Sequence, residues 1–115
     1  MGINWNEVIA HALSLPDTVE GSHYGGQAVK VASNGRAFIA PGREADSFCL
    51  LIDIDTVEML KDTDPDTYYQ TPHYVGWPGV LVRFATDDPD RVRSMIALAR
   101  DQAAVRKPSK PRKKT

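Results

Sequence analysis

The sequence predicts an α+β domain in which an antiparallel sheet of about five strands carries an N-terminal and a C-terminal helix on one face. Apolar residues recur at helical spacing near both ends of the domain, and segments with alternating apolar residues lie between them. An Asn-Gly dipeptide separates two of these segments, as it does in tight hairpins. We expect one short helix between strands, and the other face of the sheet left available.

Length and composition indicate a single globular domain. With 115 residues, the chain is long enough for one hydrophobic core and too short for two ordinary domains. Its 42% hydrophobic and 25% charged residues are typical of folded proteins. We therefore expect a monomeric domain over residues 1–104 and a disordered basic tail over residues 105–115, because the Pro-interrupted tail has nothing to bury.

The first helix is predicted to begin after Asn4, because Glu7 follows three residues later as in a capping box. The Leu15-Pro16 pair ends it. His11 is expected on its polar side together with Glu7. The residues that form its apolar stripe are Trp5, Val8, Ile9 and Ala12.

Residues 27–33 and 36–40 flank the Asn34-Gly35 dipeptide and predict a hairpin with a two-residue turn. In that register Ser33 lies opposite Arg36, and Val31 lies opposite Phe38. Lys30 and Ile39 then share the outer face. The residues assigned to the core face are Val29, Val31, Phe38 and Ala40.

Residues 47–53 are apolar on both faces, which favours a central strand. A short helix is expected over residues 56–61. Asp55 together with Glu58 would open this helix, and the Asp64-Pro65-Asp66 turn would close it.

The remaining elements are two strands and a closing helix. Residues 67–71 are typical of a short strand, and residues 80–84 of a longer one whose Leu81 and Arg83 face outward. Asp88 is the predicted N-cap of the last helix, with Pro89 at its first position. The core-facing residues are Val80, Val82 and Phe84 of the strand and Val92, Met95, Ile96 and Ala99 of the helix.

The net charge of −1 conceals a segregation of charge along the chain. Residues 106–115 hold 6 of the 14 basic residues and no acidic one, which leaves 8 basic against 15 acidic side chains in residues 1–105, a formal charge of −7. The folded part therefore repels phosphate, while the tail attracts it. The candidate binding residues in the tail are Lys107, Lys110, Arg112, Lys113 and Lys114.

No pattern of catalytic or metal-binding residues stands out. The adjacent Ser22-His23 pair lacks a Gly-x-Ser-x-Gly context and fits a glycine-bounded surface loop. The three histidines, His11, His23 and His73, are scattered, and the carboxylates between Asp53 and Asp66 fit helix caps and a solvated acidic face. We expect no enzymatic activity and no cofactor.

Cys49 is the only cysteine, so the chain holds no internal disulfide. It lies in an apolar stretch and is expected to be an inert buried thiol. The start of the chain lacks the basic and apolar regions of a secretion signal, and no apolar run is long enough to cross a membrane. A cytoplasmic protein with no membrane contact is therefore expected.

Residues 71–79 combine two aromatic residues, a histidine, two prolines and two glycines within nine positions. One interpretation is a strand-joining loop in which Tyr74 and Trp77 cap the edge of the core. The other is a binding surface on the open side of the sheet, where aromatic faces combine with nearby positive charge. The candidate binding residues in the folded part are Lys30, Arg36, His73, Tyr74, Trp77 and Arg83.

The segment Thr71-Pro72-His73-Tyr74-Val75-Gly76-Trp77-Pro78-Gly79-Val80-Leu81-Val82-Arg83 resembles the corresponding segment of MmcQ/YjbR-like proteins. Residues 10–16 with Glu20, residues 29–38 and residues 64–69 are similar to that family in the same order. The resemblance covers roughly residues 5–100 and implies a frataxin-like (CyaY-like) α+β fold. Members of the family tend to end soon after the last helix, whereas this chain continues into a lysine-rich tail.

The resemblance implies DNA binding through wing-like hairpins and supplies no catalytic residue. The Asn34-Gly35 hairpin is the candidate wing, and the basic tail would add affinity that is weak and sensitive to salt. The alternative is an adaptor that binds a protein or a small ligand through the open sheet face and the 71–79 loop. Fold analogy alone suggests a third function, frataxin-like metal handling by the carboxylates between Asp53 and Asp66.

Overall fold

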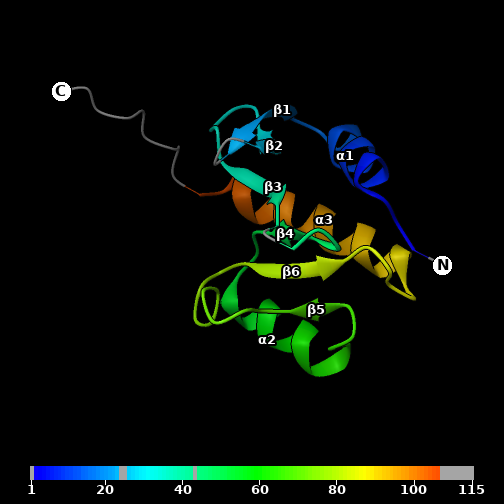
Figure 1. Ribbon diagram of the computed structural model, residues 1–115. Coiled ribbons are helices and arrows are strands. Elements are labelled where there is room, and N and C mark those ends of the chain that lie inside the picture. The colour runs from blue at the N-terminus through cyan, green and yellow to red at the C-terminus, as the bar shows by residue number, and fades with distance from the viewer. Residues whose placement is uncertain (1, 24–25, 43, 107–115) are drawn as a thin grey trace.

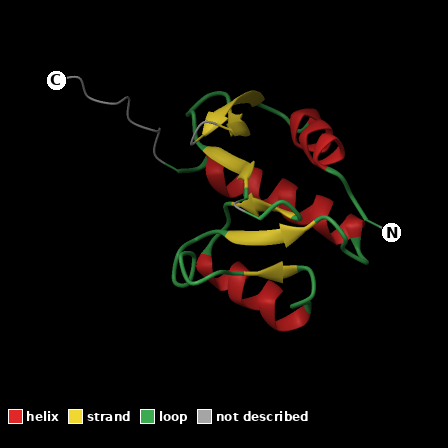
Figure 2. Ribbon diagram, in the orientation of Figure 1, coloured by secondary structure: helices red, strands yellow, loops and turns green. Residues whose placement is uncertain are grey.

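The residues that the structure describes form one six-stranded antiparallel sheet and three helices, so the predicted α+β class is confirmed (Figures 1 and 2). This computed structural model describes residues 2–23, 26–42 and 44–106. The strands lie in the order β1-β2-β3-β4-β6-β5. The helices are α1 (Trp5–Ser14), α2 (Ile54–Thr63) and α3 (Pro89–Ala104). The strands are β1 (Thr18–His23), β2 (Gly26–Val31), β3 (Ala37–Pro41), β4 (Ser47–Leu50), β5 (Tyr68–Tyr69) and β6 (Val80–Arg83).

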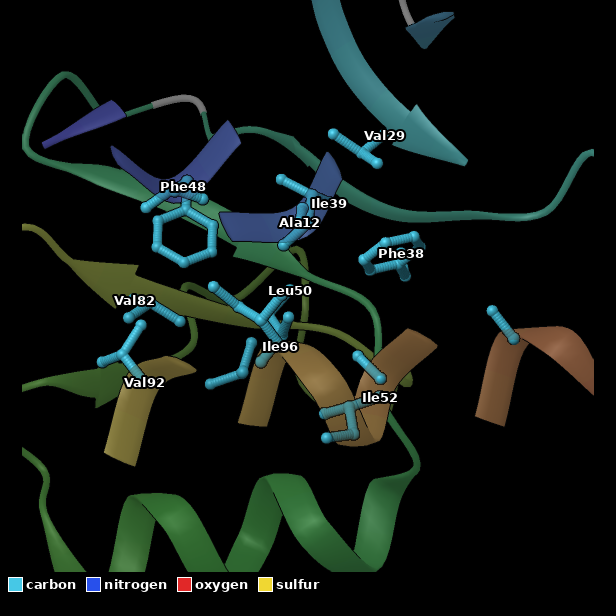
Figure 3. Close-up of a cluster of buried hydrophobic side chains, with 14 of the residues drawn as sticks. Ala12, Val29, Phe38, Ile39, Phe48, Leu50, Ile52, Val82, Val92 and Ile96 are labelled. Carbon is cyan, nitrogen blue, oxygen red and sulfur yellow. The ribbon is translucent and has the colours of Figure 1, made fainter. Parts of the chain in front are cut away.

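The main core lies between one face of the sheet and the helices, as Figure 3 shows for the strands and α3. Phe48 and Leu50 of the central strand β4 meet Ile96 of α3 there, and Ala12 of α1 reaches the same cluster. The predicted placement of the N-terminal and C-terminal helices on one face is confirmed. Helix α2 adds Val57 and Leu60 to this core.

The helix starts follow the sequence closely because their caps are local. The Asn4 side chain accepts a hydrogen bond from the Glu7 backbone N–H at 2.8 Å, and the Glu7 carboxylate accepts one from the Asn4 N–H at 3.0 Å, which completes the capping box. Asp88 accepts from the Arg91 N–H at 3.1 Å at the start of α3. For α2, Asp53 is the N-cap, and the predicted start near Asp55 was wrong by two residues.

The predicted two-residue hairpin turn was wrong. The Gly35 N–H donates to the Val31 carbonyl at 2.8 Å and the Val31 N–H donates to the Arg36 carbonyl at 2.8 Å, so Val31 faces Arg36 across a four-residue turn. Gly35 supplies the positive φ of 73° that this turn needs. Ser33 lies in the turn and does not pair with Arg36.

A β-bulge changes which residues of β3 reach the core. Lys30 pairs with Ala37 and Val29 pairs with Ile39, so Phe38 is an extra residue in β3. As a result Phe38 and Ile39 both enter the main core, whereas Ala40 packs on the opposite face of the sheet. The predicted faces of Ile39 and Ala40 were therefore wrong.

The boundaries of three further segments differ from the prediction. Residues 18–23 form edge strand β1, in which Glu20 pairs with Val29, so the glycine-bounded loop expected at Ser22-His23 was wrong. Strand β4 ends at Leu50 rather than at residue 53, although its central position is confirmed. Strand β5 has only two residues. Among the described residues, no helix is long and apolar enough to cross a membrane.

Candidate binding surface

The outer face of the sheet carries a small apolar cluster rather than an open surface. Ala40 pairs with Cys49, and Cys49 pairs with Leu81, so the three buried side chains form a row across β3, β4 and β6. Tyr69 continues the row as the partner of Leu81. Tyr74, from the loop that joins β5 to β6, packs against this cluster. The sheet face that was expected to be available is therefore covered by the 71–79 loop where Tyr74 packs on this cluster.

The side-chain amide of Gln70 hydrogen-bonds to the 71–79 loop at three points. Its Nε2 donates to the carbonyl oxygens of Tyr74 at 2.8 Å, Trp77 at 3.2 Å and Gly79 at 2.8 Å. Its Oε1 accepts from Lys61 Nζ at 2.8 Å. Because the amide satisfies three loop carbonyls and is itself fixed to α2, the loop has a defined conformation.

Trp77 and Val75 form the exposed tip of this loop. The side chain of Val75 is 67% exposed and that of Trp77 is 37% exposed. The indole rests on Gly79, where a Cβ would lie 2.2 Å from its Cζ3 atom. Its ring centroid also lies 5.3 Å from that of Tyr74, at a tilt of 48°. The loop therefore holds an aromatic ring in place and leaves part of it accessible.

Tyr74 belongs to the structural part of the loop. It hydrogen-bonds to the thiol of Cys49, and the two residues pack in the same outer cluster. Burial raises the pKa of Cys49 to about 11, and the bond to Tyr74 only partly opposes this shift. The expectation of a buried thiol is confirmed. Of the two aromatic residues, Trp77 is thus the better candidate for contact with a partner.

Arg83 does not lie beside the loop. It is at the opposite end of β6, where its guanidinium stacks over the Tyr69 ring at 4.0 Å and donates to the Asp66 carbonyl at 3.0 Å. The Asp46 carboxylate lies 3.8 Å from its Nε. These contacts satisfy the charge locally and make Arg83 part of the packing over β5.

Lys30 and Arg36 lie away from both the 71–79 loop and Arg83. Lys30 is on β2, where its stem runs beside Gly21, and Arg36 directly follows the β2–β3 turn. Strands β3 and β4 separate β2 from β6, a distance of about 14 Å across the sheet. Lys30, Arg36 and Arg83 therefore form no continuous positive strip. His73 is exposed in the 71–79 loop.

Four other cations of the folded part contact nearby polar side chains, three of them carboxylates. Lys61 pairs with Glu58 at 3.0 Å, Arg93 pairs with Asp90 at 2.7 Å, and Arg100 Nη2 lies 2.5 Å from the Asp101 carboxylate. Arg91 donates to Thr63 Oγ1 at 2.9 Å. Helix α3 consequently presents no row of unpaired cations that could enter a nucleic-acid groove along its described surface.

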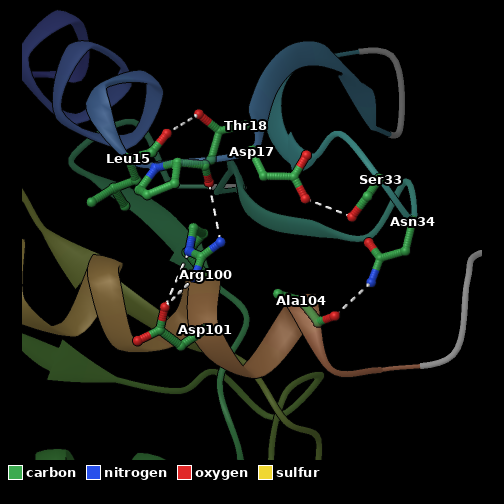
Figure 4. Close-up of polar contacts among 9 residues, drawn as sticks. Leu15, Asp17, Thr18, Ser33, Asn34, Arg100, Asp101 and Ala104 are labelled. Atoms are coloured by element: carbon green, nitrogen blue, oxygen red, sulfur yellow. Dashed lines mark hydrogen bonds and ion pairs between the residues drawn. The ribbon is translucent and has the colours of Figure 1, made fainter.

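The last described residues, where the basic tail begins, are tied to the β2–β3 turn. The Asn34 side chain donates to the Ala103 carbonyl at 2.8 Å and also lies 3.4 Å from the Ala104 carbonyl, the contact drawn in Figure 4. Arg100 Nη1 donates to the Pro16 carbonyl at 3.1 Å. In the same region Ser33 Oγ donates to the Asp17 carboxylate at 2.5 Å. Asp17 itself has a positive φ of 58°, which aspartate tolerates better than most residues.

A chain of backbone and side-chain contacts puts the end of α3 and the 71–79 loop at the same end of the molecule (Figure 1). Gln102 Oε1 accepts from the Asp53 N–H at 2.9 Å. The backbone N–H of the preceding residue, Ile52, donates to the Pro78 carbonyl at 3.3 Å. Pro78 adjoins Trp77. The tail residues Lys107, Lys110, Arg112, Lys113 and Lys114 lie outside the described residues.

The adjacent Ser22-His23 pair and the scattered histidines are placed as follows by the structure. Ser22 lies in edge strand β1, and the side chain of His23 is outside the described part. His11, expected on the polar side of its helix, lies outside the buried stripe of α1 and is half-buried, with Nε2 3.2 Å from the Arg93 carbonyl. No group of three or more His, Cys, Asp or Glu side chains is arranged to hold a metal ion in the part described.

No protein-family model, curated protein or solved structure matches this chain.

Two residues that shape the candidate surface were not predicted from the sequence. Gln70 lies just before the loop, and nothing in the local pattern shows that its amide reaches three carbonyls between residues 74 and 79. Gly79 was interpreted only as part of the 71–79 loop. The aromatic residue two positions before it, together with a following strand, is the signal that could have indicated close packing over a glycine.

Proposed function

We propose that this chain is an MmcQ/YjbR-like protein that binds nucleic acid without enzymatic activity, and that its basic tail provides most of the affinity. The charge distribution carries the proposal. Residues 106–115 hold six cations and no acidic residue, whereas residues 1–105 have a formal charge of −7. Phosphate neutralisation dominates non-specific binding, so the segment that attracts phosphate is the one expected to bind it.

The contacts within the folded part support this assignment of the affinity to the tail. Lys61, Arg83, Arg93 and Arg100 each lie within 4.0 Å of a carboxylate oxygen. A phosphate that approached them would compete with these carboxylates and meet the negative charge of the body. The β2–β3 turn, which was proposed as a wing, also contacts the end of α3 through Asn34. The side-chain amide of Asn34 is therefore already hydrogen-bonded within the domain.

A gel-shift titration with and without residues 106–115 tests the proposal. We expect the shortened chain to lose at least tenfold in affinity at physiological salt, because about six phosphate contacts disappear. A full-length variant with glutamine at Lys107, Lys110, Lys113 and Lys114 keeps the tail length and should lose most of the affinity as well. Equal affinity for all three proteins would rule the assignment out.

A second candidate function, a protein-binding adaptor, is favoured by one observation. Val75 and Trp77 expose apolar surface at the tip of a loop that Gln70 holds in a fixed conformation. Val75→Ala and Trp77→Ala should each abolish capture of a partner and leave the melting temperature nearly unchanged. Tyr74→Ala is a poorer probe than the sequence indicated, because Tyr74 packs against the outer cluster and its loss lowers stability directly.

A further inference from the structure

We infer that the free edge of β1 binds an extended peptide segment of another protein as an additional strand, and that Lys30 pairs with an acidic side chain of that segment. Among the described residues, β1 pairs only with β2, so its other side is an edge of the sheet. Such an edge is a template for main-chain hydrogen bonds to a further strand. This surface is separate from the nucleic-acid binding proposed above and does not depend on it.

The pattern of backbone hydrogen bonds identifies the groups that face this edge. The Ala32 N–H donates to the Asp17 carbonyl at 2.7 Å just before β1 begins, which makes these two residues a hydrogen-bonded pair of the ladder. Hydrogen-bonded and non-hydrogen-bonded pairs alternate along antiparallel strands, so every second residue of β1 turns its N–H and C=O groups away from β2. The residues whose backbone groups face the edge are Thr18, Glu20 and Ser22.

Exposed apolar side chains flank the edge on both faces of the sheet. Val19 is 47% exposed on the outer face, and Leu13 of α1 is 37% exposed on the helix side. Helix α1 packs under β1 and β2, and α3 packs under β2 and β3, so the flank of α1 away from α3 faces the edge. His11 contacts Arg93 of α3, and Leu13 lies about 200° around the helix from His11. An added strand would therefore contact Val19 on one face and Leu13 on the other.

Lys30 brings a positive charge to the edge. Its Cδ and Cε atoms lie 3.3 Å from the position that a Cβ of Gly21 would occupy, so its stem crosses from β2 over β1. A side chain at position 21 would obstruct this path, which accounts for a glycine inside the strand. Lys30 forms no salt bridge with a carboxylate of the described residues. An acidic side chain opposite Gly21 on an added strand can therefore pair with the ammonium.

A second copy of this chain fits the edge less well than a peptide of this kind. Residues directly opposite each other share a face of the sheet, so two copies of β1 can pair only in registers that keep their faces. A register centred on Glu20 places two carboxylates opposite each other, and one centred on Gly21 brings two Lys30 side chains together. A register centred on Val19 ends at Asp17, whose positive φ of 58° interrupts the extended strand.

A synthetic peptide of matching chemistry tests the inference. Paired antiparallel to β1, acetylated and amidated Thr-Glu-Lys-Val-Ile places its glutamate opposite Gly21, its lysine opposite Glu20 and its valine opposite Val19. NMR titration of the full chain should shift the amide signals of Thr18, Glu20 and Ser22, with half-saturation below about 1 mM. Unchanged signals at about 1 mM peptide would overturn the inference.

Methylation of the peptide backbone separates strand pairing from non-specific attraction. N-methylation of the peptide lysine removes a donor that faces the β1 edge and should abolish binding. N-methylation of the peptide valine, whose N–H points away from β1, should leave binding nearly unchanged. Equal effects of the two methyl groups would contradict addition as a strand. A free chain that sediments as a dimer and becomes monomeric with the peptide would assign the edge to a second copy instead.

Substitutions in the chain test the chemistry of the partner. Lys30→Glu should weaken binding roughly fivefold to tenfold, and a peptide with lysine in place of its glutamate should restore it. Val19→Ala should weaken binding about twofold to threefold. Val75→Ala is the matched control, since this exposed valine lies in the loop between β5 and β6, at the other side of the sheet. Amide spectra of the free variants verify their fold, and a folded Lys30→Glu protein that binds both peptides like the parent would refute the charge pairing.

Discussion

The side-chain amide of Asn34 donates a hydrogen bond of 2.8 Å to the carbonyl oxygen of Ala103, and so joins the β2–β3 turn to the last turn of α3. Carbonyls in the last turn of a helix have no partner within the helix, and a side chain from elsewhere commonly satisfies them. The same amide lies 3.3 Å from the Arg106 carbonyl. Asn34 therefore fixes the point from which the basic tail leaves the domain.

Asn34→Ala should lower the free energy of unfolding by about 1 kcal/mol, because a partly buried hydrogen bond to a helix end is lost. Urea denaturation measures this change. Asn6→Ala is the matched control, since Asn6 is exposed on α1, and its effect should be close to zero. Equal effects of the two substitutions would show that the Asn34 contact adds no stability.

Gln70→Glu should loosen the 71–79 loop, because the substitution keeps the shape and the acceptor for Lys61 but removes the donor to three carbonyls. We expect a loss of about 2 kcal/mol in the free energy of unfolding and a shift of Trp77 emission toward that of solvated indole. Lys61→Gln removes only one bond to the Gln70 side chain and should cost less. A Gln70→Glu protein with unchanged stability and emission would contradict the role of Gln70 as the clamp of the loop.

Alkaline pH should destabilise the fold through two buried groups. Burial raises the pKa of Cys49 to about 11 and that of Tyr68 to about 12, from ordinary values of 9.0 and 10.0. Both groups are neutral when protonated, so their contribution is fully present below pH 9 and is lost as the pH rises through about 11 to 12. The urea midpoint should therefore fall above pH 9.

Cys49→Ala isolates one part of this pH dependence. The variant should lose less stability than the parent between pH 8.5 and pH 10.5, by on the order of 1 kcal/mol, because it has no thiol to ionise. Comparing the slopes of stability against pH, rather than absolute stabilities, cancels the effect of the smaller side chain. Parallel curves for parent and variant would contradict the pKa shift.

Thiol accessibility reports on the loop itself. Cys49 is only 3% exposed and Tyr74 covers it, so a thiol reagent at pH 8 should react far more slowly with the folded protein than with the unfolded one. Tyr74→Ala should accelerate the reaction at least tenfold, whereas Trp77→Ala should leave it nearly unchanged. Similar rates for the parent and Tyr74→Ala would mean that Tyr74 does not shield the thiol.

The sequence predicted the elements whose determinants are local. Asn4 with Glu7, and Asp88 with Pro89, define helix starts through contacts within one turn, and both starts are confirmed. Strand β1 was not predicted, because Gly21 and Ser22 obscure its alternation and its strand character comes from pairing with β2. The bulge at Phe38 depends on tertiary packing and leaves no periodic signal.

The candidate surface shows the same division between local and long-range information. Tyr74 and Trp77 were predicted to act together, and they do lie ring to ring. Lys30 and Arg83 were predicted to share a surface with them, but the strand order places β3 and β4 between those two cations. The Asn34-Gly35 pair is characteristic of a tight turn, whereas the fold uses the Asn34 side chain to bond to α3, at the far end of the sequence.

The salt dependence of nucleic-acid binding tests the central claim most directly. Affinity for one oligonucleotide should be measured from low to physiological salt for the full chain and for residues 1–105. The six cations of residues 106–115 predict a steep line for the full chain, with a slope of log affinity against log salt of about −4 to −5, and a shallow line with weak binding for the shortened chain. Two lines of the same slope and height would contradict the claim that the tail binds the phosphates.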